Sequence, residues 1–342
     1  MPLSKGLAVR LVPDPRIAVI GAAGFAGAVA ARIIDRHPAF ELGPCQARSD
    51  VGERLDALYP HHRVEVRLDD IDPDALNGVD AAIVALPHGA AAEVVSRIRG
   101  NGIRVVDLSA DFRLGSLDTY EAWYGPHGAP ELFGSGVYGL PEINRDLIAT
   151  ADLVACPGCY PTASVLALMP LAKAGLIEST VVSAMSGVSG AGRAASRRTH
   201  FVTVAENASA YGLDGHRHEP EISEQLAHLG GESGVVFVPH LVPIDQGELV
   251  SCFSELREPR TSDELLMLYA EAYADEPFVE VTTDSPGMRD VRETNRCRIT
   301  VRNHRSGKAI AIAAIDNLWK GAAGQAVQCL NLMFDRPETE GL

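Results

Sequence analysis

The segment "RIAVIGAAGFAGAVAARIIDRH" at residues 16–37 constrains the fold more than any other part of the chain. A short apolar run leads into three regularly spaced glycines, and apolar residues then recur at helical spacing, which predicts a strand, a tight turn and a helix. Small residues in such a turn let a pyrophosphate approach the backbone at the helix N-terminus. The motif also occurs where no nucleotide binds. Here it favours a dinucleotide site with contacts at Gly21, Gly24, Phe25, Ala26 and Gly27.

Further strands extend this start into an α/β domain with a Rossmann-type, doubly wound parallel sheet. "FELGPCQARS" ends a second predicted strand, and "DAAIVALPHG" and "IRVVDLSADFR" predict two more buried parallel strands. A Rossmann domain contacts the ribose where the second strand ends, and an acidic residue there suits NAD, whereas an arginine suits the 2′-phosphate of NADP. Arg48 and Ser49 stand at that point, before any carboxylate. We therefore expect NADP, with Pro87 as a further contact and a merely solvated Arg48 as the alternative.

The length and charge of the chain set broad limits on its function. Its 342 residues predict two domains, and the net charge of −15 argues against nucleic acid as a partner. No apolar run approaches the roughly 18 residues that span a bilayer, and the N-terminus holds no block of signal-peptide length. The six cysteines are scattered, with no second Cys-x-x-Cys or Cys-x-x-His. We expect a cytoplasmic protein with no membrane partner and no metal site.

One close cysteine pair lies in "ACPGCYPTA", just before a helical pattern that begins near Pro161. Two thiols at this spacing form a redox dithiol or half of a zinc site, or comprise one nucleophile and a bystander. Cys159 directly precedes the helix, so we expect the helix N-terminus to lower the pKa of its thiol. Cys156 precedes Pro157 and is biased towards extended backbone. These positions favour Cys159 as the nucleophile.

The rest of the second half predicts a mixed or antiparallel sheet and a histidine pair. The predicted strands lie in "TVVSAMS", "SGVVFVPHLVPI", "GELVSCFSEL", "CRITVRNH" and "AIAIAAID". In "HRHEPEI", His216 and His218 come just before a helix, and an imidazole near a thiol can act as its acid/base partner. Thiol, imidazole and NADP together predict reduction of an activated acyl group through a thioester. A buried cysteine and a capping or surface histidine are the alternatives.

Donors suited to phosphate or carboxylate groups occur in the loop "SGVSGAGR" and in "DFR". We expect substrate contacts at Arg113, Ser189 and Arg193. We expect cofactor contacts at Ser186 and Gly187. Plain loop geometry is the alternative for each serine and glycine.

Nine blocks of sequence, in order, resemble the N-acetyl-γ-glutamyl-phosphate reductase family over nearly the whole chain. They are "GAAGFAG", "ALPHGAA", "VVDLSADFRL", "YGLPEINR", "PGCYPTA", "SGVSGAGR", "HRHEPEI", "PHLVPI" and "IDNLWKGAAGQAVQCLN". The resemblance implies NADPH-dependent reduction of an acyl phosphate to a semialdehyde in arginine biosynthesis, with Cys159 as nucleophile. It places the acid/base histidine at His218, with His216 in reserve. It also implies that a C-terminal helix brings Asn317 back to the cofactor domain, and that the protein is a homo-oligomer, either a dimer or a tetramer.

Two positions depart from the usual family pattern. Cys156 stands where the family usually has asparagine, and Gln246 stands where it has arginine before Gly247. The second exchange removes a guanidinium that can bind an anion, so a related acyl phosphate stays open as substrate. An aspartate-semialdehyde, aminoadipate-type or glyceraldehyde-phosphate-type dehydrogenase and a non-catalytic NADP-binding regulator are further alternatives.

The expected division of the chain has three parts. Residues 1–158 form the NADP-binding domain, and residues 159–315 form an α+β domain for substrate binding and oligomerisation. Residues 316–342 form the helix that returns to the cofactor domain.

Overall fold

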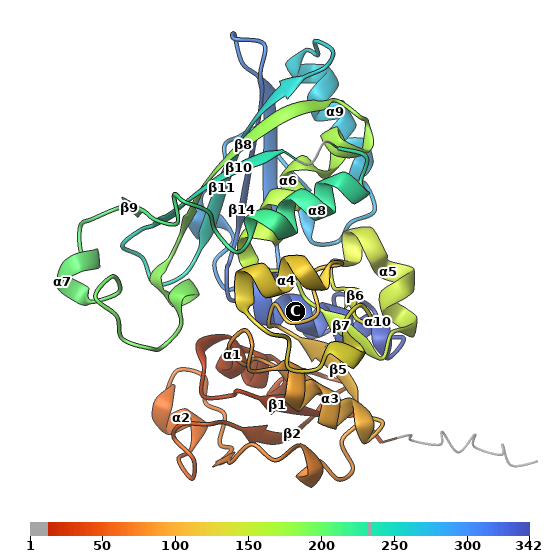
Figure 1. The fold of residues 1–342 in the computed structure, drawn as a ribbon, viewed down its shortest axis with the longest axis vertical. Coiled ribbons are helices and arrows are strands. Elements are labelled where there is room, and N and C mark those ends of the chain that lie inside the picture. The colour runs from red at the N-terminus through yellow and green to blue at the C-terminus, as the bar shows by residue number, and fades with distance from the viewer. Residues whose placement is uncertain (1–12, 232–233) are drawn as a thin grey trace, which may run out of the picture.

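Two β-sheets organise the chain, described here from a computed structural model (Figure 1). The structure describes residues 13–231 and 234–342, and within them each sheet has seven strands. The first sheet lies in the lower half of Figure 1 and the second in the upper half. Residues 1–12, on which the cytoplasmic expectation partly rests, lie outside the described residues. Along the described ranges, no helix is long and apolar enough to cross a membrane.

The first sheet is parallel throughout its described pairings. In spatial order its strands are β3 (Leu68–Asp69), β2 (Glu41–Gln46), β1 (Arg16–Ile20), β4 (Ala81–Val84), β5 (Arg104–Asp107), β7 (Leu153–Ala155) and β6 (Val137–Tyr138). Neighbouring side chains of β1 point to opposite faces, so that Ile17 packs with helix α1 (Phe25–Asp35) and Ala18 packs with α3 (Ala92–Gly100). Helices cover both faces, which confirms the predicted doubly wound sheet.

The second sheet is mixed, as predicted. In spatial order its strands are β12 (Val279–Val281), β13 (Cys297–Asn303), β14 (Ala309–Ile315), β11 (Glu248–Leu256), β8 (Ile177–Ser186), β10 (Val235–Leu241) and β9 (Ser209–Ala210). β8 runs parallel to β10 and β12 parallel to β13, and the other neighbours are antiparallel. One face packs against α6 (Cys159–Lys173), α8 (Glu219–His228) and α9 (Ser262–Ala272). Strands β8, β10 and β11 also carry exposed apolar side chains: Val181, Met185, Val236 and Phe253.

Helix α6 links the two sheets. Most of its residues are buried, because the second sheet, α8 and the C-terminal segment pack around it. The chain ends in a π-helical turn at Trp319–Ala323 and in α10 (Gly324–Met333), which packs on α1 and on α5 (Pro141–Thr150). The remaining α-helices of the described residues are α2 (Leu55–Leu58), α4 (Leu117–Tyr124) and α7 (Phe201–Val204), and short 3₁₀-helices lie at Pro73–Ala75, Pro130–Leu132, Val188–Ala191 and Met288–Asp290. Because α6 begins at Cys159, this packing sets the thiol at the junction of the two sheets.

Candidate active site

A cleft of about 1000 Å³ is lined by residues from both halves of the molecule. Its walls are the glycine turn after β1, the segments after β2 and β4, the start of α6, the loop after β8 and the loop before α8. The structure brings the predicted site residues together in this one cleft. They are Gly21, Gly24, Phe25, Ala26, Gly27, Arg48, Ser49, Pro87, Arg113, Cys159, Ser186, Gly187, Ser189, Arg193, His216, His218 and Asn317.

The glycine turn after β1 has the shape that a dinucleotide needs. Gly21 has φ +89°, and a methyl group added to it would lie 2.4 Å from the carbonyl oxygen of Ala85. A methyl group on Gly27 would lie 2.2 Å from the carbonyl oxygen of Gly21, so both positions require glycine. Helix α1 starts after Gly24 without a side-chain cap and without an acidic residue in its first turn. Its first N–H groups are therefore available to a pyrophosphate, and the turn fits the predicted cofactor.

Two arginines stand at the same end of the cleft. Arg48 is exposed and makes one long hydrogen bond, of 3.5 Å, to a backbone carbonyl, so its guanidinium is open to a phosphate group. Arg193 comes from the loop after β8 and donates hydrogen bonds to the Ala23 carbonyl and the Asp50 carboxylate, both at 2.8 Å. The sequence predicts Arg193 as a substrate contact, but the structure places it against the glycine turn.

Cys159 is the first residue of α6, one position further into the helix than expected, and it lines the cleft. Burial is the main influence on its thiol and, together with the neighbouring Glu248 carboxyl, raises its pKa well above the ordinary value. The N–H of Tyr160 lowers the pKa, which is the effect expected of a helix N-terminus, but it lowers it by less. The predicted lowering of the pKa is therefore wrong for the free chain. The resting sulfur is a thiol, and a base must take its proton.

His218 lies against the backbone that precedes the nucleophile. A methyl group added to Gly158 would lie 2.5 Å from Nε2 of His218, so glycine is needed there to make room for the imidazole. The His216 ring centroid is 4.9 Å from that of His218, and His216 Nδ1 accepts a 3.1 Å hydrogen bond from the His218 backbone N–H. Burial lowers the pKa of His218 well below its usual value and that of His216 to about 4. Both imidazoles are thus neutral at rest.

A buried ion pair holds the backbone just before the nucleophile. Glu221, in the first turn of α8, accepts hydrogen bonds from the Gly158 N–H and the Tyr138 hydroxyl, both at 3.0 Å. Its second oxygen lies 3.4 Å from a guanidinium nitrogen of Arg113. Arg113 also donates a 2.6 Å hydrogen bond to the Cys156 carbonyl. The predicted substrate contact Arg113 is therefore engaged in fixing the active-site backbone, and Glu221 is a site residue that the sequence analysis misses.

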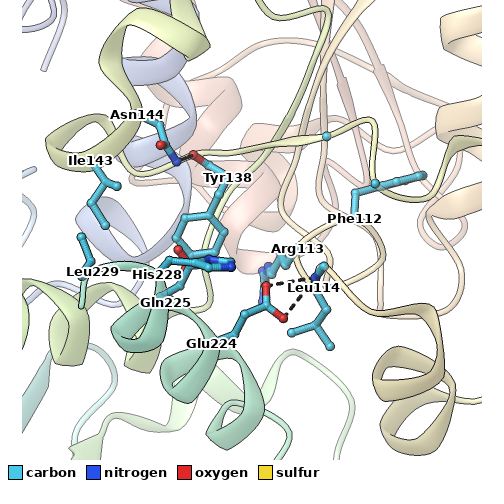
Figure 2. A pocket seen from close by; sticks show the side chains of 13 residues that line it. Phe112, Arg113, Leu114, Tyr138, Ile143, Asn144, Glu224, Gln225, His228 and Leu229 are labelled. Atoms are coloured by element: carbon cyan, nitrogen blue, oxygen red, sulfur yellow. Dashed lines mark hydrogen bonds between the residues drawn. The ribbon is translucent and has the colours of Figure 1, made fainter. Parts of the chain in front are cut away.

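Arg113 also lines a smaller cavity of about 390 Å³, whose walls include the middle of α8 and the start of α5 (Figure 2). The carboxylate of Glu224 accepts the backbone N–H of Gly115 on its two oxygens, at 3.0 and 3.1 Å. Glu221 and Glu224 are one helical turn apart, so α8 is fastened to the first domain at two points. This attachment fixes the start of the helix, where His218 stands.

At another wall of the cleft, Asn317 connects the loop after β8 with the segment just before β11. Its side-chain oxygen accepts a 2.7 Å hydrogen bond from the Gly247 N–H, and its side-chain nitrogen donates to the Ser189 hydroxyl at 3.0 Å. The Gly187 N–H donates to the Gly247 carbonyl at 2.9 Å. Ser186 is buried and its hydroxyl bonds to the carbonyl of Gly187. The predicted residues of this region thus form one hydrogen-bonded wall.

Comparison with known proteins places this geometry in a family. The chain matches the semialdehyde dehydrogenase NAD binding domain over residues 16–151 and the semialdehyde dehydrogenase dimerisation domain over residues 159–317. It is 46% identical, over 339 residues, to the N-acetyl-gamma-glutamyl-phosphate reductase of Desulforudis audaxviator, covering 96% of this chain and 97% of that one. The protein of the same name from Alkalilimnicola ehrlichii is 46% identical over 335 residues, covering 95% and 97%. The chain belongs to the N-acetyl-γ-glutamyl-phosphate reductase family.

Solved structures of more distant proteins share the fold. Aspartate semialdehyde dehydrogenase II from Vibrio cholerae, complexed with ASA, has a TM-score of 0.73 at 20% identity and covers 94% of this chain and 98% of its own. Aspartate semialdehyde dehydrogenase with NADP from Candida albicans has a TM-score of 0.70 at 14% identity, with coverages of 94% and 98%. At these identities the likeness concerns the fold alone. The membership expected from the nine sequence blocks is confirmed by the closer relatives.

The cleft of this N-acetyl-γ-glutamyl-phosphate reductase family member also contains two arginines that the sequence analysis does not single out. Arg198 lies over the Tyr211 ring, 4.7 Å from its centroid, and Arg217 lies over the Tyr124 ring, at 5.5 Å. Within the described residues neither guanidinium forms an ion pair with a carboxylate, and both lower the pKa of His216. In the sequence they look like ordinary surface arginines, and only the fold brings them beside the histidines.

The second cysteine of the pair lies outside the cleft. Cys156 is buried and its side chain lies beside that of Cys329. All six cysteines are free thiols, and Cys159 is the one among them that is partly exposed. Among residues 13–231 and 234–342 no group of three or more His, Cys, Asp or Glu side chains is placed to hold a metal ion.

Proposed function

We propose that this chain reduces N-acetyl-γ-glutamyl phosphate to N-acetylglutamate semialdehyde and phosphate with NADPH, as a step of arginine biosynthesis. The observation that carries the proposal is the position of Cys159. It stands at a helix N-terminus, beside a neutral imidazole, in a cleft that also contains a dinucleotide turn. Arg198 and Arg217 in the same cleft have no carboxylate partner among the described residues. The curated relatives that match nearly the whole chain carry the name of this reaction.

The cofactor end of the cleft is the glycine turn. The N–H groups at the start of α1 bind the pyrophosphate, and Phe25, Ala26 and Pro87 line the path of the dinucleotide. Arg48 and Ser49 receive the 2′-phosphate of the adenosine ribose. When NADPH is bound, it supplies the hydride that reduces the thioester carbon. Arg193 holds the loop after β8 against the cofactor end by its hydrogen bonds to the Ala23 carbonyl and the Asp50 carboxylate. This role differs from the substrate contact first expected.

At the other end, Cys159 is the nucleophile. Its sulfur attacks the acyl carbon, the bond from that carbon to the phosphate oxygen breaks, and the acyl group stays on the sulfur as a thioester. The neutral imidazole of His218 is the acid/base for the substrate oxygens, because Nε2 lies at Gly158 and the buried Nδ1 has no hydrogen-bond partner within the described chain. His216 supports it through the bond from the His218 N–H. After reduction, the carbon–sulfur bond breaks and releases the aldehyde.

The two ends of the acyl phosphate are anionic, and Arg198 and Arg217 supply the charge that holds them. Each guanidinium lies over a tyrosine ring, which orients it, and neither is neutralised by a carboxylate among the described residues. Ser189 adds a hydroxyl at the wall that Asn317 organises. Gln246, which stands where the family usually has arginine, lies beside Gly187 and next to Gly247 in this wall. Gln246 carries no charge, so Arg198 and Arg217 supply the positive charge that binds the substrate.

The open face of the second sheet supports a homodimer. Val181, Met185, Val236 and Phe253 are between 37% and 57% exposed on neighbouring strands β8, β10 and β11. Apolar side chains grouped on one face mark a protein interface. We place the dimer contact there and the protein in the cytoplasm, where its six thiols stay reduced. The division at residues 1–158, 159–315 and 316–342 is part of the same proposal.

A single-turnover assay tests the function. Enzyme and NADPH are mixed with N-acetylglutamyl phosphate, and the loss of NADPH absorbance is followed beside parallel reactions with aspartyl phosphate and the aminoadipate homologue. We expect the N-acetylglutamyl substrate to be reduced fastest. Faster reduction of either rival would reassign the substrate, and no NADPH oxidation with any of the three would leave a non-catalytic NADP-binding regulator.

A further inference from the structure

Glu248 is a buried acid that the scheme above does not use. It is the first residue of β11, and its neighbours across the sheet are Ser186 of β8 and Ile315 of β14. The residue has 0% exposure. Neither carboxyl oxygen makes a hydrogen bond of regular geometry within the described residues, and no cation pairs with it there. A buried, unpartnered carboxyl destabilises a fold, so its presence calls for a reason.

The group beside this carboxyl is the thiol of the nucleophile. The side chains of Glu248 and Cys159 lie within hydrogen-bonding reach, because α6 packs against β11. Gly321 closes the other side: a methyl group added to it would lie 2.9 Å from Cβ of Cys159. The sulfur is therefore held between a glycine and a carboxyl group.

We propose, on the basis of the function proposed above, that Glu248 exchanges the proton of Cys159 during the reaction, while His218 handles the protons of the substrate. The reactive form of the pair has lost one proton, so that Glu248 is ionised and Cys159 is still a thiol. In the first step the thiol S–H bond breaks, its proton moves to the Glu248 carboxylate, and the sulfur forms its bond to the acyl carbon as phosphate leaves. In the last step the carbon–sulfur bond breaks, the electron pair returns to sulfur, and the Glu248 carboxylic acid gives the proton back. Glu248 gains and loses one proton per cycle, and the proton that phosphate takes up comes by way of His218.

The titration of the pair has a distinctive form. Burial raises the pKa of Glu248 to about 8, with a smaller contribution from Asp316, and the ionised carboxylate in turn raises the pKa of the thiol. Arg113 also acts on the pair and lowers the pKa of the thiol. The other titratable groups near it are Tyr160, Tyr211 and Cys297, and burial raises the pKa of each, so all three stay neutral around pH 8. Below about pH 8 the acid is protonated and can donate to a thiolate, so the thiolate fraction rises tenfold per pH unit. Above it, the new negative charge opposes further ionisation and the rise flattens.

Alkylation of the thiol measures this profile without any substrate. The rate of Cys159 modification by iodoacetamide is followed by peptide mass spectrometry from about pH 6 to about pH 10, a range that spans the ordinary pKa of a thiol. In the unmodified protein we expect a break near pH 8, at the pKa of Glu248. In Glu248→Gln we expect the break to vanish and the rate to keep rising, because the amide can still donate to the thiolate but cannot ionise. Glu248→Leu, which offers no donor, should be slower throughout.

Glu255→Gln is the matched control, because it makes the same exchange on the same strand at an exposed position paired with Lys308. It should keep the profile of the unmodified protein. In turnover, Glu248→Gln should lower kcat about 10²-fold or more at neutral pH with little change in KM for NADPH. A Glu248→Gln profile that still breaks near pH 8, or a Glu248→Leu protein with normal kcat, would overturn the proposal. The chain could reduce no acyl phosphate and still show the break in the alkylation profile near pH 8, with its loss in Glu248→Gln. The proposed function would then be refuted, and proton exchange between Glu248 and Cys159 would stand.

Discussion

The two ends of the cleft use different kinds of chemical group to bind their ligands. At the cofactor end, the binding groups are backbone N–H groups of the glycine turn and the exposed side chain of Arg48. At the thiol end, they are side chains with less access to solvent: His218 is partly buried, and Glu221 and Glu248 are buried. The glycine turn is one contiguous segment, to which the segment after β2 adds Arg48, whereas α6, α8 and β11 assemble the thiol end. The turn that binds the pyrophosphate is therefore a local structure, whereas the thiol end is a product of the tertiary fold.

The two ends also differ in charge. Burial moves the titratable groups of the thiol end towards their neutral forms: it raises the pKa of Cys159 and Glu248 and lowers that of His218. At the cofactor end the guanidinium of Arg48 stays solvated. Changes at the thiol end should therefore act on kcat, through proton transfer. Changes at the cofactor end should act on KM, through anion binding.

The largest effect is expected from Cys159→Ser. A serine hydroxyl at this position is far less acidic and less nucleophilic than the thiol, so no thioester should form and turnover should be abolished. Mass spectrometry of protein mixed with acyl phosphate in the absence of NADPH should show the acyl adduct on Cys159 in the unmodified chain and none in the variant. NADPH binding should be unchanged, because the glycine turn is intact. An adduct on another cysteine would contradict the assignment.

His218→Asn should have the next largest effect. The variant keeps a side chain of similar size but lacks a group that can exchange protons, so kcat should fall about 10²–10⁴-fold while NADPH binding persists. His216→Asn is the matched control. Its ring contacts His218, whereas the His218 imidazole reaches Gly158. Steady-state kinetics of both variants settle the choice, and greater damage from His216→Asn would reverse the two roles.

Arg48→Asp should have a smaller effect, confined to the cofactor. Replacing the guanidinium by a carboxylate removes a charge-assisted contact to the 2′-phosphate and adds a repulsion, so KM for NADPH should rise about 10- to 100-fold. KM for NADH, which lacks that phosphate, should change little. The ratio of the two KM values measures the effect. Equal use of both cofactors by the unmodified protein would show that Arg48 does not read the phosphate.

The features that local sequence predicts, and those that it does not, divide between the same two ends of the cleft. The strand, turn and helix at the start of the first sheet were predictable, because glycine spacing and apolar periodicity are local signals. A helix beginning close to Cys159 was equally predictable from Pro161, to within one or two residues. The pKa of the thiol was not, because its direction depends on burial and on Glu248, which comes from a distant strand. Local sequence supplies the helix terminus but not its surroundings.

Arginines show the limit most clearly. Arg113 and Arg193 look like anion contacts in the sequence, yet Arg113 is committed to Glu221 and Arg193 to Asp50. Arg198 carries no motif, yet it lies in the cleft without an ion-pair partner among the described residues. A guanidinium binds whichever acceptor the fold brings near it, and sequence spacing does not reveal that acceptor.

The smallest effect is expected from Cys156→Asn, which restores the residue usual in the family. Cys156 does not line the cleft, and its contribution to the site is its backbone carbonyl, which accepts the hydrogen bond from Arg113. That carbonyl is present in either residue, so the backbone before Cys159 should stay in place. The buried amide needs a partner, and the neighbouring Cys329 thiol is a weak one, so a loss of about 1 kcal/mol of stability is the expected cost.

Turnover should therefore stay within about threefold of normal, while the melting temperature falls by roughly 2–4 °C, the shift that 1 kcal/mol produces in a chain of this size. Calorimetry and steady-state kinetics of the same preparation separate the two effects. The dithiol mechanism predicts the opposite result, because it needs both sulfurs and would lose turnover with Cys156. A disulfide between Cys156 and Cys159 that forms during the cycle, trapped and located by mass spectrometry, would give the thiol end a redox function in place of the acyl chemistry argued here.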